Sequence, residues 1–173
     1  MAAGRAALEN VLAHSELLKG FSPIHIERFQ DLATTVTAEA GSELFRSGEY
    51  AQHLYVALDG EVELRMNVPE WWGIDTPHRK VSTAKAGQIF GWSALVEPFV
   101  YSLTAVCVTD ATLARFEGSQ LADLCVRDPH VGYRLLGQVL KVVSGRFHTL
   151  AEAVMAQRAV QVSQAASRAR HPD

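Results

Sequence analysis

The sequence predicts a mainly β domain with flanking helices, followed by a long C-terminal helix. Apolar residues recur at helical spacing up to about residue 33. They then fall into short runs separated by glycines, and from residue 131 they return to helical spacing. With 173 residues, of which 48% are hydrophobic, the chain is long enough to bury one good core. We therefore expect one domain with an appendage.

The N-terminal part, from Ala2 to about Ala33, is predicted to form two or three short helices. Its apolar residues at helical spacing are Leu8, Val11, Leu12, Leu17, Leu18, Ile24, Ile26, Phe29 and Leu32. Ser22 and Pro23 indicate a helix start, because serine is a common N-cap and proline suits the first helical position.

Short β-rich runs begin after Gly41. The clearest is LYVALDGEVELRM, residues 54–66, in which Asp59-Gly60 predicts a tight antiparallel hairpin, because this dipeptide accepts the positive φ of such a turn. Further strands are expected at RKVSTA (residues 79–84), at Gln88 to Gly91, and within Leu103 to Phe116. Short strands without helices between them favour a sandwich or barrel over a parallel sheet.

The last third of the chain is predicted to be helical. Ser119 to Leu124 indicates a short helix, Asp128-Pro129 a break, and Val131 to about Ala166 one uninterrupted helix. Such a helix of about 36 residues would be about 54 Å long, more than a domain of this size covers.

This helix carries apolar residues at alternating spacings of four and three, which is a heptad pattern. They are Leu136, Leu140, Val143, Phe147, Leu150 and Val154. The pattern predicts a dimer interface, most simply with a parallel copy of the same helix. In the alternative, its first half packs on its own β domain and the end of the helix frays.

Composition limits the partners. Sixteen Lys and Arg against 19 Asp and Glu give a net charge of -3, so no overall basic field favours direct nucleic-acid binding. No stretch approaches the ~20 apolar residues of a membrane span, and no secretory signal is recognisable. Cys107 and Cys125 are far apart in apolar surroundings and are interpreted as reduced core residues of a cytoplasmic protein.

Three separated motifs resemble the cyclic nucleotide-binding domain family. Residues 40–64, AGSELFRSGEYAQHLYVALDGEVEL, are similar to the family's first strands. AGQIFGW (residues 86–92) is similar to the turn into its phosphate-binding cassette, and DPHVGYRLL (128–136) to the hinge before its terminal helix. The resemblance implies a double-stranded β-helix, the jelly-roll β-roll, at residues 1–130 with its N-terminal helices, and a dimerisation helix with a frayed tail at 131–173.

The resemblance also implies which residues hold the ligand. In members that bind cyclic nucleotides, a glycine and a glutamate open the cassette, and an arginine and a small hydroxyl residue close it on the phosphate. Gly91 and Ser102 match two of these positions, whereas Trp92 replaces the glutamate and Tyr101 the arginine. Glu97-Pro98 interrupts a slightly shortened cassette. Because arginine supplies a permanent, forked positive charge, ordinary cyclic-AMP binding is not expected.

Two interpretations of the cassette remain open. The Gly91-Trp92-Ser93 turn offers free N–H groups, and aromatic rings and hydroxyls lie nearby in the sequence; together they suit a neutral or weakly polar aromatic ligand. The hydroxyls are those of Ser93, Tyr101, Ser102 and Thr104, and the rings those of Trp92, Phe99 and Tyr101. Alternatively, Trp92 and Tyr101 fill the former pocket themselves. Arg146 is a further ligand-binding candidate, because the resemblance places it where the terminal helix of relatives reaches the ligand; pairing with Glu152 or water is the alternative.

Other features suggest a regulatory role. Trp71 and Trp72, on a turn-rich loop, either dock a protein partner or pack on the β domain. The histidines show no metal-ligand spacing; relatives that bind haem exist, but no histidine is singled out for it here.

No catalytic constellation is recognisable, and the winged helix-turn-helix of related transcription factors is not expected. The sequence thus predicts a non-catalytic, stand-alone sensory module, or alternatively a ligandless dimeric scaffold.

Overall fold

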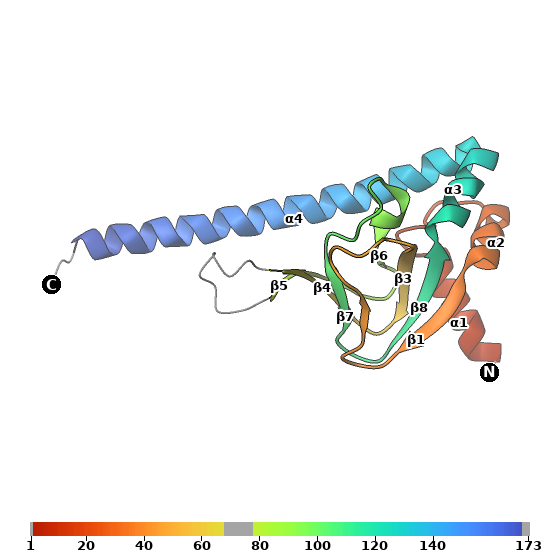
Figure 1. Cartoon of the computed structure of the whole chain (residues 1–173), viewed down its shortest axis with the longest axis horizontal. Helices are drawn as coiled ribbons and strands as arrows, with labels where there is room; N and C mark the ends of the chain where they lie inside the picture. Colours follow the sequence, from red (N-terminus) through yellow and green to blue (C-terminus); the bar gives the residue numbers. More distant parts are fainter. Residues whose placement is uncertain (1, 68–77, 171–173) are drawn as a thin grey trace. The chain divides into compact units, whose positions relative to one another are not determined.

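The structure is a computed structural model that describes residues 2–67 and 78–170, with the side chains of residues 2–5, 8, 150, 153, 154 and 156–170 excluded. It divides into two compact units, 1–139 and 140–173. Figure 1 shows the chain coloured along its sequence. Trp71 and Trp72 lie outside the described residues, so their role stays a prediction. None of the described helices is long and apolar enough to cross a bilayer.

Two N-terminal helices precede the strands, as predicted. They are α1 (Ala2–Ala13) and α2 (Pro23–Leu32). Ser22 has the extended backbone of an N-cap and Pro23 opens the helix, but the Ser22 hydroxyl makes no capping bond. It contacts Nδ1 of His25 at 3.0 Å instead.

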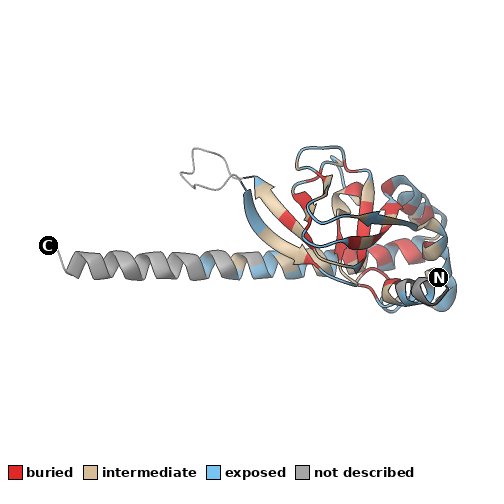
Figure 2. Cartoon of the chain, turned by 90° about the horizontal axis from the view of Figure 1, so that it is seen from below, coloured by how far each residue is buried: buried red, intermediate tan, exposed pale blue. Residues whose placement is uncertain are grey.

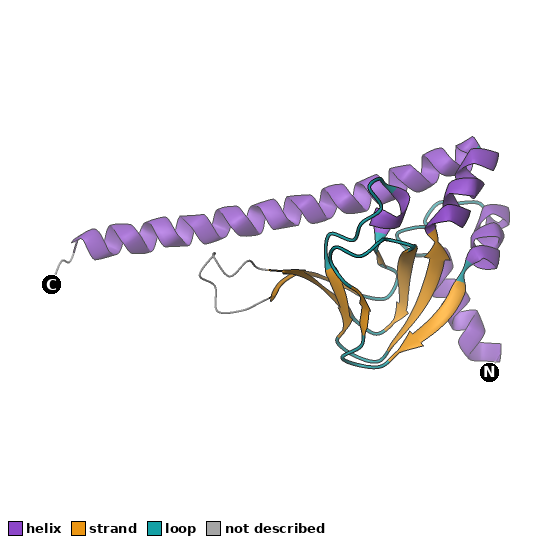
Figure 3. Ribbon diagram, viewed as in Figure 1, coloured by secondary structure: helices purple, strands orange, loops and turns teal. Residues whose placement is uncertain are grey.

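In the described part of the chain, eight strands form two antiparallel four-stranded sheets, which confirms the mainly β fold class (Figure 3). Sheet A has the order β1-β8-β3-β6 and sheet B the order β2-β7-β4-β5. The strands are β1 (Thr34–Ala38), β2 (Glu43–Phe45), β3 (His53–Asp59), β4 (Val62–Asn67), β5 (His78–Ala84), β6 (Ile89–Phe90), β7 (Thr104–Cys107) and β8 (Ala111–Glu117).

The predicted hairpin around Asp59-Gly60 is wrong, because β3 and β4 belong to different sheets and do not pair. Gly60 does have a positive φ, of 82°. However, the turn moves the chain from sheet A to sheet B, and β4 then pairs with β5 and β7. The turn packs against residues 108–111: a Cβ on Gly60 would lie 2.3 Å from the carbonyl oxygen of Asp110.

The core lies between the two sheets and beneath the N-terminal helices (Figure 2). In β3, residues 54–58 are all buried, because sheet A is covered on both faces. Tyr55 and Ala57 belong to the cluster between the sheets. On the other side of sheet A, Phe29 of α2 contacts Phe116 of β8 edge to face, with ring centroids 6.5 Å apart.

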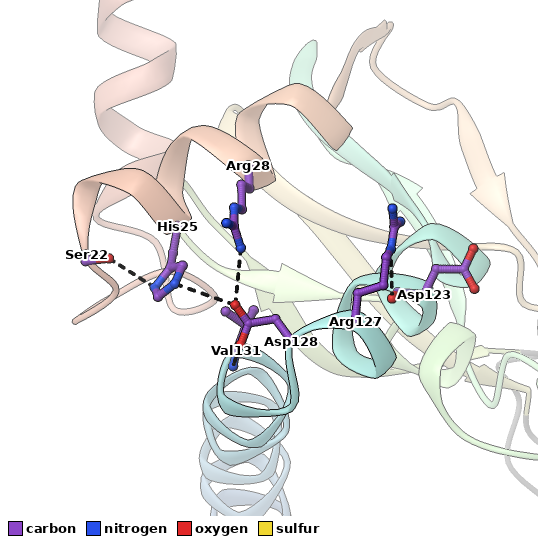
Figure 4. A network of polar contacts seen from close by, with 7 residues as sticks. All are labelled: Ser22, His25, Arg28, Asp123, Arg127, Asp128 and Val131. Carbon is purple, nitrogen blue, oxygen red and sulfur yellow. Dashed lines mark hydrogen bonds and ion pairs between the residues drawn. The ribbon is translucent and has the colours of Figure 1, made fainter.

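Two helices follow the strands, α3 (Gly118–Arg127) and α4 (Pro129–Arg170), each extending beyond its predicted range. Asp128 lies between them, and its Oδ1 accepts a hydrogen bond from the Val131 N–H at 3.2 Å. Arg28 of α2 donates to Oδ2 of the same carboxylate, also at 3.2 Å (Figure 4). The Val131 N–H, together with His25 and Arg28, lowers the pKa of Asp128.

Within the first unit, α4 has a buried and an exposed side. Val131, Leu135 and Val139 recur every four residues and are buried. Tyr133 and Leu136 are exposed, at 80% and 52% respectively. The first turns of α4 are therefore amphipathic.

The turn between the sheets can be tested with Gly60→Ala. We expect this change to lower the free energy of unfolding by at least ~2 kcal/mol, because it adds a steric clash to an unfavourable positive φ. Gly48→Ala is the matched control, since Gly48 has a φ of 92° but nothing within 4 Å of an added Cβ. It should cost only about 1 kcal/mol in urea unfolding. Equal losses for the two variants would contradict the sheet-to-sheet turn.

Candidate functional site

The candidate cassette begins where β6 ends, at Gly91. Gly91 has a φ of 76°, in the left-handed region. A Cβ there would lie 2.8 Å from the His53 carbonyl oxygen and 3.4 Å from the ring of Tyr101. This position therefore requires glycine for both its conformation and its close packing.

A single turn of 3-10 helix, η2 (Trp92–Leu95), follows the glycine. Ala94 is buried in it, and a Cβ added to Gly118 would lie 2.3 Å from the Ala94 carbonyl oxygen. The backbone of the cassette therefore packs directly on the start of α3. Trp92 and Ser93 are half-buried.

The cassette returns through Glu97-Pro98, a cis peptide, and Phe99, whose φ is 56°. Glu97 is exposed. The returning limb pairs with the loop between β2 and β3: the Tyr101 N–H donates to the Glu49 carbonyl at 2.9 Å, and the Gly48 N–H donates to the Tyr101 carbonyl at 2.8 Å. This pairing fixes the direction in which the Tyr101 side chain leaves the backbone.

Tyr101, at the position that the resemblance assigns to arginine, points between the sheets and is only 4% exposed. Its ring stacks on Phe45, with centroids 3.7 Å apart and planes 10° apart. Its hydroxyl donates to the His53 carbonyl at 2.8 Å and accepts from the His53 N–H at 3.0 Å. Burial raises the pKa of Tyr101 to about 12, although the hydrogen bond to His53 opposes the shift.

The surroundings of Tyr101 are aromatic and aliphatic. Tyr55 and Phe90 stack at 5.1 Å, and Phe45 lies within 6.2 Å of the Phe90 ring, measured between centroids. Burial raises the pKa of Tyr55 as well. Among the described residues, the buried polar side chains are those of Ser15 and Thr104, so no lysine or arginine is buried in this cluster.

The predicted hydroxyl residues differ in their exposure to solvent. Ser102 is exposed, and its carbonyl accepts from the Ser47 hydroxyl at 3.2 Å. Thr104 is buried, and its hydroxyl accepts from the Ser47 N–H at 3.1 Å. The structure thus brings Gly91 and Tyr101 together, whereas Ser102 faces solvent.

A hollow of about 390 Å³ lies beside η2, lined by residues 50–53, by the cassette and by the start of α3. Its lining includes Tyr50, His53, Ala94, Phe99, Gly118 and Ala122. Burial, followed by the nearby Arg115, lowers the pKa of His53. The sequence analysis did not find this hollow, because it depends on three segments that are distant in the chain.

The predicted dimer residues lie on α4, in both units. Leu136, Leu140 and Phe147 are exposed at 52%, 67% and 72%, and Val143 is half-buried. The side chains of Leu150 and Val154 are outside the described set. Tyr133, three residues before Leu136, continues the same spacing and was missed by the sequence analysis. The heptad spacing of the sequence would have identified it, because the interval from Tyr133 to Leu136 is three residues and the next is four.

Arg146 lies in the second unit and the cassette in the first, so its predicted reach to the ligand stays a prediction. Both cysteines are free, and burial raises the pKa of each thiol. No group of three histidine, cysteine, aspartate or glutamate side chains suited to a metal occurs in the part of the chain that the structure describes.

Comparisons with known proteins agree with this fold. A protein of Geobacter metallireducens named as cyclic nucleotide-binding is 20% identical, with 86% of this chain and 99% of that one covered and a TM-score of 0.66. A cyclic nucleotide-binding domain from Methylobacillus flagellatus is 17% identical, with 90% and 84% covered and a TM-score of 0.75. The catabolite activator protein of Thermus thermophilus is 22% identical, with 82% and 63% covered and a TM-score of 0.66.

A curated relative from Rhodopseudomonas palustris, named for a potassium channel, is 25% identical over 137 residues. The match covers 79% of this chain but only 31% of that protein's length. The sequence model of the cyclic nucleotide-binding domain matches residues 35–128, which span the described strands from the second residue of β1 onwards and all of α3. The chain therefore belongs to the cyclic nucleotide-binding domain family.

Proposed function

We propose that this chain is a non-catalytic regulatory module whose cassette does not hold a cyclic nucleotide in the way usual for its family. The observation that supports this most directly is the buried Tyr101, in the place of the phosphate-binding arginine. A neutral ring cannot balance a phosphate charge, and the single hydroxyl proton of Tyr101 is already donated to His53.

The energetic consequence is large. Loss of an arginine–phosphate contact costs a few kcal/mol, equivalent to two or more powers of ten in affinity. The replacement of the expected glutamate by Trp92 removes a second contact, to the ribose. Both substitutions lower the affinity for a charged sugar-phosphate.

The stacked pair of Tyr101 and Phe45 favours a cassette that is closed by its own side chains. In that case the module acts through its partners and not through a ligand between the sheets. A second candidate, sensing of a neutral or weakly polar molecule, is favoured by the hollow of about 390 Å³ beside η2, which is large enough for a small ligand.

We also propose that the module is a homodimer through α4. The exposed residues Tyr133, Leu136, Leu140 and Phe147 follow the alternating spacing of a coiled-coil seam. Large apolar side chains that recur on one side of a helix are typical of an interface. Two copies would cover each other's seam.

The cassette proposal can be tested by calorimetry with cyclic AMP and, as a matched uncharged probe, adenosine. We expect cyclic AMP to bind no more tightly than adenosine, with a Kd above about 1 mM, because no arginine in the cassette neutralises the phosphate. Micromolar binding of cyclic AMP, at least tenfold tighter than adenosine, would contradict the proposal. If Arg146→Ala abolished such binding, the charge would be assigned to α4.

The role of Tyr101 can be tested with Tyr101→Phe. We expect a loss of about 1–3 kcal/mol in the free energy of unfolding at pH 7, because two hydrogen bonds to the His53 backbone disappear. Since folding raises the pKa of Tyr101 to about 12, its stabilising contribution is present below pH ~10 and is lost as the pH rises towards ~12. The variant should lose less stability than the wild type over this range.

Tyr50→Phe is the control for this measurement, because Tyr50 is 65% exposed and lies outside the proposed dimer seam. Its urea unfolding should match that of the wild type at every pH. Identical behaviour of the Tyr101 and Tyr50 variants would mean that the hydroxyl of Tyr101 does not hold the cassette.

The dimer can be tested with Val143→Glu. A carboxylate within the seam would be desolvated without a partner, so we expect the variant to be monomeric, with a mass near 18.9 kDa by light scattering. Lys141→Glu, at an exposed position outside the seam, should leave the dimer mass unchanged. An unchanged mass for Val143→Glu would count against this interface.

A further inference from the structure

The hollow of about 390 Å³ beside η2 is lined by aromatic rings and by a carboxylate. We propose that it binds a small organic cation, whose alkylated ammonium group lies against the rings of Tyr50 and Phe99 and is balanced by Glu117. Tyr101 does not line this hollow, so the proposal goes beyond the cassette function proposed above. A cation also replaces the neutral ligand of the second candidate, because the lining is negatively charged.

Two aromatic side chains give the hollow an affinity for cations. The rings of Tyr50 and Phe99 have centroids 6.4 Å apart and planes inclined at 56°. Tyr50 is 65% exposed and Phe99 is half-buried, so neither ring is enclosed in the core. An aromatic face attracts a cation that lies within about 6 Å of the ring centre. A cation seated beside this pair is within that distance of both rings.

Glu117 supplies the negative charge. Its carboxylate accepts from the Ser119 hydroxyl at 3.0 Å and makes no ion pair among the described residues. The lining includes no lysine or arginine in the part of the chain that the structure describes. Arg115, two residues before Glu117, is likewise not part of the lining. The carboxylate can therefore balance the charge of a bound cation.

His53 does not cancel this charge at pH 7. It lies opposite Glu117 in the pairing of β3 with β8, and it also lines the hollow. Burial, followed by the nearby Arg115, lowers the pKa of His53, and Glu117 opposes the shift. The imidazole is therefore mainly neutral at pH 7 and adds a third uncharged ring to the lining.

The three segments that line the hollow are fixed to one another without a ligand. The Gly118 N–H donates to the Gln52 carbonyl at 2.8 Å, and the Ala51 N–H donates to the Phe99 carbonyl at 2.7 Å. These bonds join the segment before β3 to the start of α3 and to the cassette. Gly118 also packs against the Ala94 carbonyl of η2. Because the lining is already ordered, a ligand does not bear the entropic cost of assembling it.

The site can be tested with choline and neohexyl alcohol, two probes of the same shape in which a carbon atom replaces the charged nitrogen. An NMR titration of the isotope-labelled full chain follows the amides of residues 50–53, 94–99 and 117–122. We expect choline to shift these amides with a Kd of about 1–10 mM, and to bind about tenfold more tightly than neohexyl alcohol. Equal binding of the two probes, or no saturable shift with choline, would overturn the proposal.

Substitutions separate the contribution of the charge from that of the rings. Glu117→Gln keeps an acceptor for Ser119 but removes the charge, so it should weaken choline binding about fivefold and leave neohexyl alcohol unaffected. Tyr50→Ala should weaken choline binding by a similar factor, whereas Tyr50→Phe should retain it, because the ring and not the hydroxyl makes the contact. Unchanged choline affinity in both Glu117→Gln and Tyr50→Ala would refute the site.

Glu39→Gln is the matched control for the charge. It makes the same change in net charge at an exposed residue that does not line the hollow. Glu39 follows the end of β1 that pairs with Ala111, whereas Glu117 lies at the other end of β8. Choline affinity should therefore equal that of the wild type. An equal loss in Glu39→Gln and Glu117→Gln would assign the effect to the overall charge of the protein and overturn the site.

An alkylated ammonium group also occurs on the headgroup of phosphatidylcholine. Sedimentation with phosphatidylcholine vesicles distinguishes the two sources, and we expect the chain to stay in the supernatant because the proposed ligand is a free molecule. Sedimentation with the vesicles that Glu117→Gln abolished would assign the cation to the lipid and overturn the free ligand. These measurements do not involve cyclic AMP, so their failure would leave the cassette proposal standing.

Discussion

The stack of Tyr101 on Phe45, together with the two hydrogen bonds to His53, is the interaction on which the candidate site depends. It joins the returning limb of the cassette to strands of both sheets, since Phe45 belongs to sheet B and His53 to sheet A. The connection is made by side chains and backbone of the chain itself.

The glycines at the cassette and at the start of α3 are also explained by contacts within the chain. Gly91 allows a turn against the His53 carbonyl, and Gly118 allows the Ala94 carbonyl to approach the start of α3. Neither requirement involves a ligand, because each follows from how closely two backbones pack. The glycine pattern of the family can therefore persist in a chain whose polar and charged cassette residues have changed.

The fold could be predicted largely from the sequence, because helical and strand spacing are local properties and three motifs of the family occur in order. The hairpin at Asp59-Gly60 could not, since the turn chemistry accounts for the φ of Gly60 but not for the sheet that each strand joins. The pairing partners of β3 are more than thirty residues away along the chain. Candidate site residues could be named from the sequence, but their geometry could not, because nothing local indicates that Tyr101 points inward while Ser102 faces solvent.

A cassette filled by its own side chains would prevent a ligand between the sheets from acting on α4. If the space between the sheets is occupied by Tyr101, a signal must reach the first turns of α4 from another surface. Apart from the cassette, the segment before α2 is bonded to Ile89 through Glu16 and to α4 through the Lys19 and Gly20 carbonyls. These contacts do not involve Tyr101, so they do not depend on whether the space between the sheets is filled.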